Sequence, residues 1–133
     1  MSKKYKVYII ARYSDGDTLD QEARRSNVIY SMAVADRLIK DGFIVFNPLL
    51  SHFQDRDFPM PYETWLEQDA EWIKVCDMVL RLSGGGTGVE RDSQVAVTHG
   101  IPVALSEAEC RHLRIFIETK SAGEARFELL SNP

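Results

Sequence analysis

The stretch of the sequence best equipped for chemistry is a glycine-rich turn that runs into two carboxylates. Four glycines lie within residues 84–88, directly after an apolar segment, 78–82, that predicts a buried strand. Because glycine has no Cβ, the backbone N–H groups of such a turn can approach a ligand closely. A helix beginning near Glu90 would direct its unpaired N–H groups at the same space and favour an anion there. Glu90 and Asp92 flank that space, so the stretch predicts an active site.

The glycine run does not by itself identify a ligand. No Lys-Ser or Lys-Thr pair follows it, which excludes a Walker loop, and its spacing does not fit the dinucleotide fingerprint. A surface turn that needs left-handed residues would explain the run about as well.

Carboxylates are the second chemical resource of the sequence. Besides Glu90 and Asp92, Asp69 lies on a predicted helix and Asp77 opens a predicted strand. Carboxylates that cleave glycosidic bonds act as nucleophile or as general acid, and often one of each is present. Each residue taken singly also has a structural explanation, because acids favour helix starts and Asp is common in turns.

The histidines and cysteines do not predict a metal site. His52 and His99 form no ligand set with a nearby Cys or Asp pair, and His112 is isolated. Cys76 and Cys110 are predicted to be free thiols, buried as small apolar residues. The sequence shows no serine nucleophile elbow either. We therefore expect neither a metal nor another cofactor.

The composition is that of a globular domain. The chain has 133 residues, of which 44% are hydrophobic and 27% charged, and its net charge of −4 argues against binding to polymeric nucleic acid. Small phosphorylated ligands need only a local positive pocket and stay open. No apolar run reaches membrane-spanning length, and the first residues do not resemble a signal peptide. A cytoplasmic location without a membrane partner is expected.

Strands and helices are predicted to alternate along the chain. Strands are expected at 5–11, 43–46, 78–82 and 101–105. Helices are expected at 26–40, 62–76, 93–99 and 106–112, with polar loops at 12–25 and 48–59. This order predicts a three-layer α/β fold of the Rossmann or flavodoxin-like kind, whose parallel sheet binds ligands at the carboxyl ends of its strands. We expect a single domain, 1–133, with a core of about 5–105 and a C-terminal extension, 106–133.

Two details of local structure depend on short patterns. In the extension, residues 114–118 and 125–129 fit either the strands of a hairpin or a helix and an extended arm. In the helix at 26–40, helical spacing predicts an apolar face that contains Ile29, Ala33, Val34, Leu38 and Ile39.

Three segments together resemble the nucleoside 2-deoxyribosyltransferase family and its nucleotide N-glycosidase relatives. They are residues 6–14, residues 69–77 with an aspartate at each end, and residues 88–103. A closer resemblance is to small uncharacterised phage and bacterial proteins of the same superfamily, which share the look of residues 47–53, 62–66 and 100–103. The resemblance covers residues 5–105 approximately, and the order and spacing of the segments carry it.

The resemblance implies chemistry at the anomeric carbon of a ribose or deoxyribose. A carboxylate attacks C1′, the base leaves, and water or a second base releases the sugar. Tyr8 matches the tyrosine beside the nucleophile, and Asp69 matches an aspartate that contacts the base. Spacing back from Gly100 puts Asp92 at the position of the nucleophile, whereas residue type favours Glu90. An Asp nucleophile is one methylene shorter than the family glutamate, which puts transfer to a second base in doubt.

A phosphate on the sugar fits the polar groups around the glycine turn, with Arg12 or Arg25 nearby. Trp65 and other aromatic residues could stack on a base, although core packing is their more frequent fate. The predicted catalytic residues are Asp92, Glu90 and Tyr8. The predicted substrate-binding residues are Arg12, Tyr13, His52, Trp65, Asp69, Asp77, Ser83, Thr87, Gly88 and Ser93.

Three functions follow from these residues and the resemblance. The first is cleavage or transfer at the N-glycosidic bond of a nucleoside or nucleoside 5′-monophosphate. The second is a nucleotide-binding or sensor module that keeps the pocket but lacks turnover. The third is an interaction protein whose contact surface is the tail after Leu113. The resemblance also implies a homo-oligomer, because in the family a neighbouring subunit commonly completes the pocket.

Overall fold

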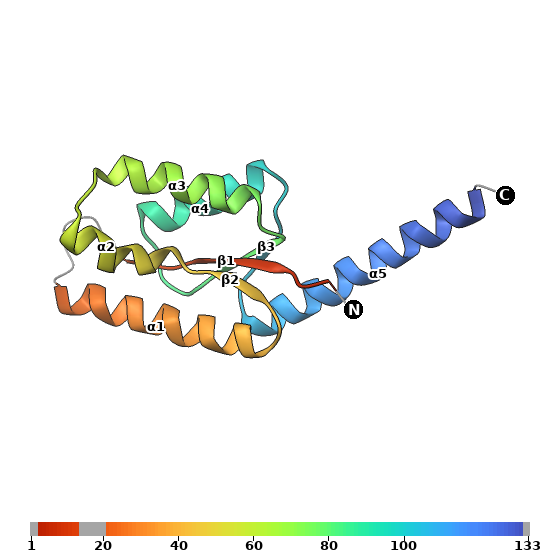
Figure 1. The fold of residues 1–133 in the computed structure, drawn as a ribbon, viewed down its shortest axis with the longest axis horizontal. Coiled ribbons are helices and arrows are strands. Elements are labelled where there is room, and N and C mark those ends of the chain that lie inside the picture. The colour runs from red at the N-terminus through yellow and green to blue at the C-terminus, as the bar shows by residue number, and fades with distance from the viewer. Residues whose placement is uncertain (1–2, 14–20, 132–133) are drawn as a thin grey trace.

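The chain forms a four-stranded parallel sheet with helices on both faces (Figure 1). The computed structural model describes residues 3–13 and 21–131, with side chains described as far as residue 120. The strands are β1 (Lys6–Ile10), β2 (Ile44–Phe46), β3 (Met78–Arg81) and β4 (Val103–Ala104), in the order β2-β1-β3-β4. The helices are α1 (Gln21–Lys40), the 3₁₀ turn η1 (Pro48–Leu50), α2 (Ser51–Asp57), α3 (Tyr62–Lys74), α4 (Thr87–Thr98) and α5 (Glu107–Ser131). The predicted fold class is confirmed.

Side chains of the central strand β1 alternate between the two faces of the sheet. Val7 and Ile9 belong to an apolar cluster with residues of α1 and α5. Tyr8 and Ile10 belong to a second cluster, with residues of α3 and α4. Because successive side chains of a strand point to opposite faces, this register turns Tyr8 toward α3 and α4. The hydroxyl of Tyr8 is thereby placed beneath two helices.

The chain reverses its direction of winding between β1 and β3. From β1 it crosses through α1 to β2 on one side, and it later returns to β3 on the other side of β1. In open parallel sheets the crevice at such a reversal, outside the carboxyl ends of the strands, is where ligands bind. The segments that follow β1 and β3 border this crevice, as the sequence predicts.

Several predicted boundaries are wrong. The helix α1 begins at Gln21, within the predicted loop 12–25, of which residues 14–20 lie outside the described residues. The predicted loop 48–59 contains η1 and α2. The helix α4 begins at Thr87, inside the glycine run, and Gly86 precedes it with a φ of 135° that suits glycine. The tail forms one long helix, α5, which extends away from the body (Figure 1), so the hairpin alternative is wrong.

The predicted inner face of α1 is also partly wrong. Ile29 and Ile39 are 54% and 57% exposed, and the buried positions are Val28, Ser31, Val34, Ala35 and Leu38. A serine fits this buried stripe because its hydrogen bonds are made inside the protein. The Ser31 hydroxyl donates to the Val28 carbonyl at 2.7 Å and accepts from the Asn47 amide at 2.9 Å. A prediction from the spacing of apolar residues missed Ser31, because the sequence does not show which groups complete its hydrogen bonds.

Candidate active site

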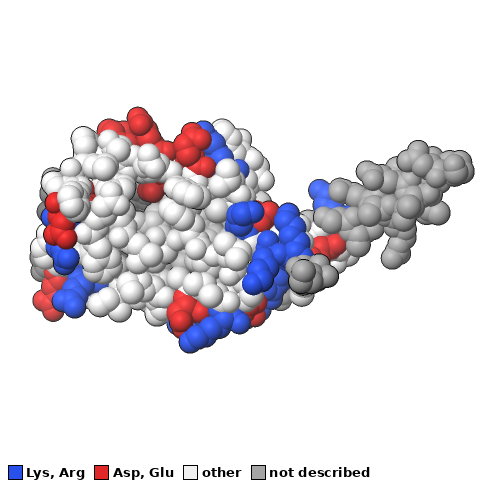
Figure 2. Space-filling view, in the orientation of Figure 1, with Lys and Arg blue, Asp and Glu red and all other residues white. Residues whose placement is uncertain are grey.

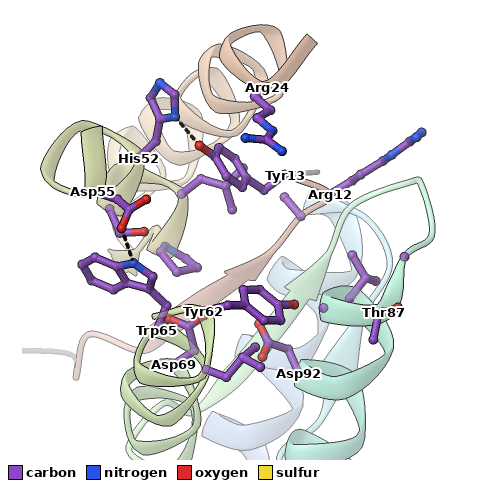
Figure 3. Close-up of a pocket in the computed structure, with 18 of the residues that line it drawn as sticks. Arg12, Tyr13, Arg24, His52, Asp55, Tyr62, Trp65, Asp69, Thr87 and Asp92 are labelled. Atoms are coloured by element: carbon purple, nitrogen blue, oxygen red, sulfur yellow. Dashed lines mark hydrogen bonds between the residues drawn. The ribbon is translucent and has the colours of Figure 1, made fainter. Parts of the chain in front are cut away.

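A cavity of about 540 Å³ opens at the carboxyl edge of the sheet, where the loop after β1, the helices α2 and α3, and the start of α4 meet. Figure 3 shows Asp69 and Asp92 on one side of it, Asp55 and Trp65 on a second, and Arg12 and Arg24 on a third. Its lining residues are Ala11, Arg12, Tyr13, Arg24, Pro48, Leu49, Ser51, His52, Asp55, Met60, Tyr62, Trp65, Leu66, Asp69, Gly85, Gly86, Thr87, Gly88, Val89 and Asp92.

Asp92 lies on the inner face of α4. The buried residues of this helix are Val89, Asp92, Ser93 and Ala96, spaced as one helical face. Asp92 is 9% exposed, and the Tyr8 hydroxyl donates a hydrogen bond to its Oδ2 at 3.3 Å. A carboxylate therefore occupies a position where the helical pattern calls for an apolar side chain.

Asp69 reaches the same tyrosine from the neighbouring helix. On α3 it lies between the buried residues Leu66 and Ile73, at helical spacing from both. A hydrogen bond with Tyr8 lowers the pKa of Asp69, although burial has the larger, opposite effect. Asp69, Tyr8 and Asp92 thus form one polar group between β1, α3 and α4. We call Asp69 and Asp92 the carboxylate pair, and Tyr8 is its tyrosine.

The carboxylate pair holds its protons more tightly than ordinary aspartates do. Burial, followed by the negative charge of Asp69, raises the pKa of Asp92 to about 7. Burial raises the pKa of Asp69 to about 6. The pKa of Tyr8 is raised well above 10 by burial and by the two carboxylates. Because ionising both carboxyls around one hydroxyl proton is unfavourable, the pair retains one proton near neutral pH.

The second wall of the cavity is built by hydrogen bonds between α2 and α3. Asp55 Oδ1 accepts from the indole Nε1 of Trp65 at 2.8 Å and from the backbone N–H of Met60 at 2.9 Å. These two bonds lower the pKa of Asp55, the backbone bond having the larger effect. His52 Nδ1 forms a hydrogen bond with the Tyr13 hydroxyl, which joins α2 to the segment after β1. The segment after β1 and the helix α2, which are far apart in sequence, are thereby held on one side of the cavity.

The third wall contains the start of α4. Its first backbone N–H groups have no partner within the helix, because the bonds of an α-helix begin only at the fifth residue. The hydroxyl of Tyr62 packs so closely over Gly88 that a Cβ there would lie 3.2 Å from it. Glycine at this position therefore permits Tyr62 to cover the first turn of the helix. Arg24, from α1, lies over the ring of Tyr13 across the cavity.

The structure brings eight of the predicted residues to the wall of this cavity, and Tyr8 contacts two of them, Asp69 and Asp92. The eight are Arg12, Tyr13, His52, Trp65, Asp69, Thr87, Gly88 and Asp92. Ser83 lines a smaller neighbouring cavity, together with Arg12 and Asn27. Ser93 is a buried residue of α4, and its hydroxyl donates to the Val89 carbonyl at 2.7 Å.

Two predicted carboxylates lie away from the cavity. Glu90 is on the outer face of α4, 66% exposed, and pairs with Arg81 at 2.6 Å. Asp77 precedes β3 and so lies at the amino edge of the sheet, opposite the cavity. Its Oδ2 accepts the backbone N–H of Lys6 at 2.7 Å. The helix register explains the position of Glu90, and strand direction explains that of Asp77.

Sequence reasoning passed over three residues of the cavity wall. Arg24 was missed because α1 was predicted to begin after it. Arg25 was chosen instead, and Arg25 does not line the cavity. Asp55 lay in a predicted loop without a partner. Tyr62 was considered only as one of the aromatic residues that could stack on a base, and it was left out of the predicted site because core packing is the more frequent fate of such residues. In the described parts of the chain, no group of three His, Cys, Asp or Glu side chains is arranged to hold a metal ion. None of the described helices is long and apolar enough to cross a membrane.

No family model matches the sequence, and no curated protein matches it. The structure is similar to that of a 2-deoxyribosyltransferase from the psychrotolerant bacterium Bacillus psychrosaccharolyticus. The two share 18% sequence identity with a TM-score of 0.51, over 74% of this chain and 69% of the other. That enzyme is described as a biocatalyst for the synthesis of antiviral and antitumoral nucleosides. The likeness confirms a nucleoside 2-deoxyribosyltransferase-like fold for this chain.

Proposed function

We propose that this protein cleaves or transfers the N-glycosidic bond of a nucleoside or nucleoside 5′-monophosphate, with Asp92 as the nucleophile. The observation that carries the proposal is the carboxylate pair and its tyrosine, buried at the inner end of the cavity. Glycosidic cleavage needs one ionised and one protonated carboxyl on the same substrate. The fold that the chain shares with a 2-deoxyribosyltransferase supports the same chemistry.

The reactive form carries the shared proton on Asp69, which is the less populated of the two arrangements because Asp92 has the higher pKa. In the first step, an ionised Asp92 oxygen forms a bond to C1′ while the bond from C1′ to the base breaks. The electron pair of that bond moves to the base nitrogen, and the Asp69 carboxyl donates its proton to the departing base. Tyr8 holds the Asp92 carboxylate in place through its hydroxyl. In the second step, water or a second base attacks C1′ and frees Asp92, while Asp69 takes up the proton that the attacking molecule loses.

The walls of the cavity support one orientation of the substrate. With C1′ at Asp92, the base extends along α3 toward Trp65, past Asp69. The 5′ end of the sugar then points to the start of α4, where backbone N–H groups and Thr87 suit a hydroxyl or a phosphate. Arg12 and Arg24 add positive charge to the wall of the same cavity.

Base release measured by chromatography over a panel of deoxynucleosides and their 5′-monophosphates tests the proposal. We expect release by the wild type, almost none by Asp92→Asn, and near-normal release by Glu90→Gln, which alters an exposed carboxylate of the same helix. Adding a second free base separates the two products, because transfer yields a new nucleoside and hydrolysis yields free sugar. Equal, negligible release by all three proteins would overturn the proposal. Tight binding without release would favour the nucleotide-binding module.

A further inference from the structure

Asp55 is an ionised carboxylate on the part of the cavity wall that the proposed function assigns to the base. Its Oδ1 accepts from both Trp65 Nε1 and the Met60 backbone N–H. Both of these hydrogen bonds end on Oδ1 and leave Oδ2 of Asp55 unused. Among the described residues, no ion pair includes Asp55, and the neighbouring Arg56 pairs with Asp57 instead. Figure 3 shows the residue beside Trp65, across the cavity from Asp92. One oxygen thus holds the wall together, and the other is available to a ligand.

The two hydrogen bonds fix the direction of this carboxylate. Met60 lies in the segment between α2 and α3, and Trp65 lies in the second turn of α3, so the two donors reach Oδ1 from two neighbouring segments of the chain. The same bonds favour the ionised form of Asp55 and lower its pKa. An ionised carboxylate accepts hydrogen bonds and cannot donate them. Asp55 therefore favours a ligand that places a hydrogen-bond donor, rather than an acceptor, next to Trp65.

We propose that Asp55 selects substrates whose base carries an exocyclic amino group. This inference rests on the proposed function, since it takes the ligand to be a nucleoside with its base against Trp65. An amino group on the edge of that base donates to Asp55 Oδ2, in the way that carboxylates accept from the amino group of cytosine. A carbonyl at the same position places its lone pairs against a negative oxygen. Amino bases are accordingly favoured over their oxo counterparts.

Two matched ligand pairs test this edge of the base. Deoxycytidine and deoxyuridine differ by an amino group against a carbonyl, and so do deoxyadenosine and deoxyinosine; in both oxo bases the adjacent ring nitrogen also carries a hydrogen. The preference is read as the ratio of kcat/KM values in the wild type, and as the ratio of calorimetric Kd values in Asp92→Asn, where turnover is blocked. A hydrogen bond to a charged group predicts a preference of about tenfold or more for the amino ligand, in whichever pair the cavity accepts.

Asp55→Asn is the informative variant. The asparagine oxygen still accepts from Trp65 Nε1 and Met60 N–H, so the wall keeps its shape, but an amide NH₂ replaces the oxygen offered to the base. The amino preference should fall to about one or reverse. Asp57→Asn is the matched control, because Asp57 lies on the same helix, pairs with Arg56 and does not line the cavity. This control should keep the wild-type preference.

The outcomes separate this inference from the proposed function. A loss of preference in Asp55→Asn alone supports the inference, because a purely structural role would weaken both members of a pair equally. Base release without an amino preference, or with a preference that survives Asp55→Asn, overturns the inference and leaves the proposed function standing. Absence of both binding and release for every nucleoside overturns both.

Discussion

Aspartates lie at both edges of the sheet, but their surroundings are opposite. At the amino edge, Asp77 accepts the backbone N–H of Lys6, and the ammonium of Lys3 lies 3.8 Å from its other oxygen. Figure 2 shows lysine and arginine side chains gathered near this edge, where α5 leaves the body. At the carboxyl edge, Asp69 and Asp92 are held beside each other and beside the hydroxyl of Tyr8.

This difference separates a structural carboxylate from the one that we propose to be functional. Asp77 gains a hydrogen bond and a nearby cation on folding, so its charge is satisfied where it lies. Asp92 loses contact with water and gains a negative neighbour, so its charge opposes folding. A protein retains such an arrangement when the reactivity of the group matters more than its contribution to stability. The following predictions test whether the aspartate at the amino edge is structural and those at the carboxyl edge are functional.

The largest effect expected is the loss of activity in Asp92→Asn. Asparagine has almost the same shape but cannot act as a nucleophile, so kcat/KM for base release should fall by about 10³-fold or more. The parallel change at the other edge, Asp77→Asn, should alter kcat/KM by less than about twofold, because it leaves the cavity untouched. Initial rates of base release measure both. A similar loss in both variants would contradict the division between the edges.

The second prediction concerns stability and runs in the opposite direction to activity. An aspartate in the unfolded chain titrates near pH 4, whereas burial raises the pKa of Asp92 to about 7 in the folded protein. The folded state therefore binds the proton more tightly, and stability falls as pH rises through this interval. Asp92→Asn removes the ionisation. At pH 8 its free energy of unfolding should exceed that of the wild type by of the order of 3 kcal/mol.

Urea denaturation at two pH values measures this effect. The stabilisation should disappear near pH 3, where the wild-type carboxyl is protonated in both states. Asp77→Asn is again the control, since Asp77 is paired and exposed to solvent at the amino edge. A destabilised Asp92→Asn at pH 8 would show that the carboxylate contributes to stability.

Much of the fold could be predicted because it depends on local patterns. The four strands are short apolar runs, and their alternation with helices dictates a parallel sheet. Errors arose where tertiary contacts override the pattern. Ser31 is buried because Asn47 completes its hydrogen bonds, and α4 starts early because glycines allow its first turn to form beneath Tyr62. Neither partner is evident from sequence spacing.

The candidate site was predictable only in its central residues. Asp92 and Asp69 each interrupt an apolar helical stripe, and the spacing of the stripe is visible in the sequence. Asp55 and Arg24 do not interrupt any pattern. They reach the cavity because α1 and α2 pack beside it, which is a property of the assembled fold. Residues that act through long-range placement therefore escaped prediction.

The third prediction is the pH dependence of base release. The reaction needs one carboxyl of the pair ionised and the other protonated. Burial raises the pKa of Asp69 to about 6 and that of Asp92 to about 7. The singly protonated pair, including its minor form with the proton on Asp69, is most populated between these values, so the rate should be greatest in that interval. Above it the acid is lost, and below it the nucleophile is protonated, each lowering kcat/KM by about tenfold per pH unit. A rate that continues to rise above pH 8 would contradict a shared proton.

The fourth prediction concerns the amino edge alone. Asp77→Ala removes the carboxylate that accepts from the Lys6 N–H, so the free energy of unfolding should fall by about 1 kcal/mol. The loss is modest because water can reach the freed N–H at this edge. Base release per folded molecule should stay unchanged. Paired urea melts and rate measurements test this, and a specific loss of activity would place Asp77 in the functional machinery.

The smallest effect is expected at Glu90, two residues from Asp92 on the same helix. Its carboxylate pairs with Arg81 on the exposed side of α4, and such surface pairs contribute less than about 1 kcal/mol. Glu90→Gln should change the free energy of unfolding by less than about 0.5 kcal/mol and kcat/KM by less than about twofold. Measuring the same two quantities for Asp92→Asn allows a direct comparison of the two carboxylates. If Glu90→Gln were instead the inactive variant, the helix register would no longer identify the nucleophile, and residue type would have been the better guide.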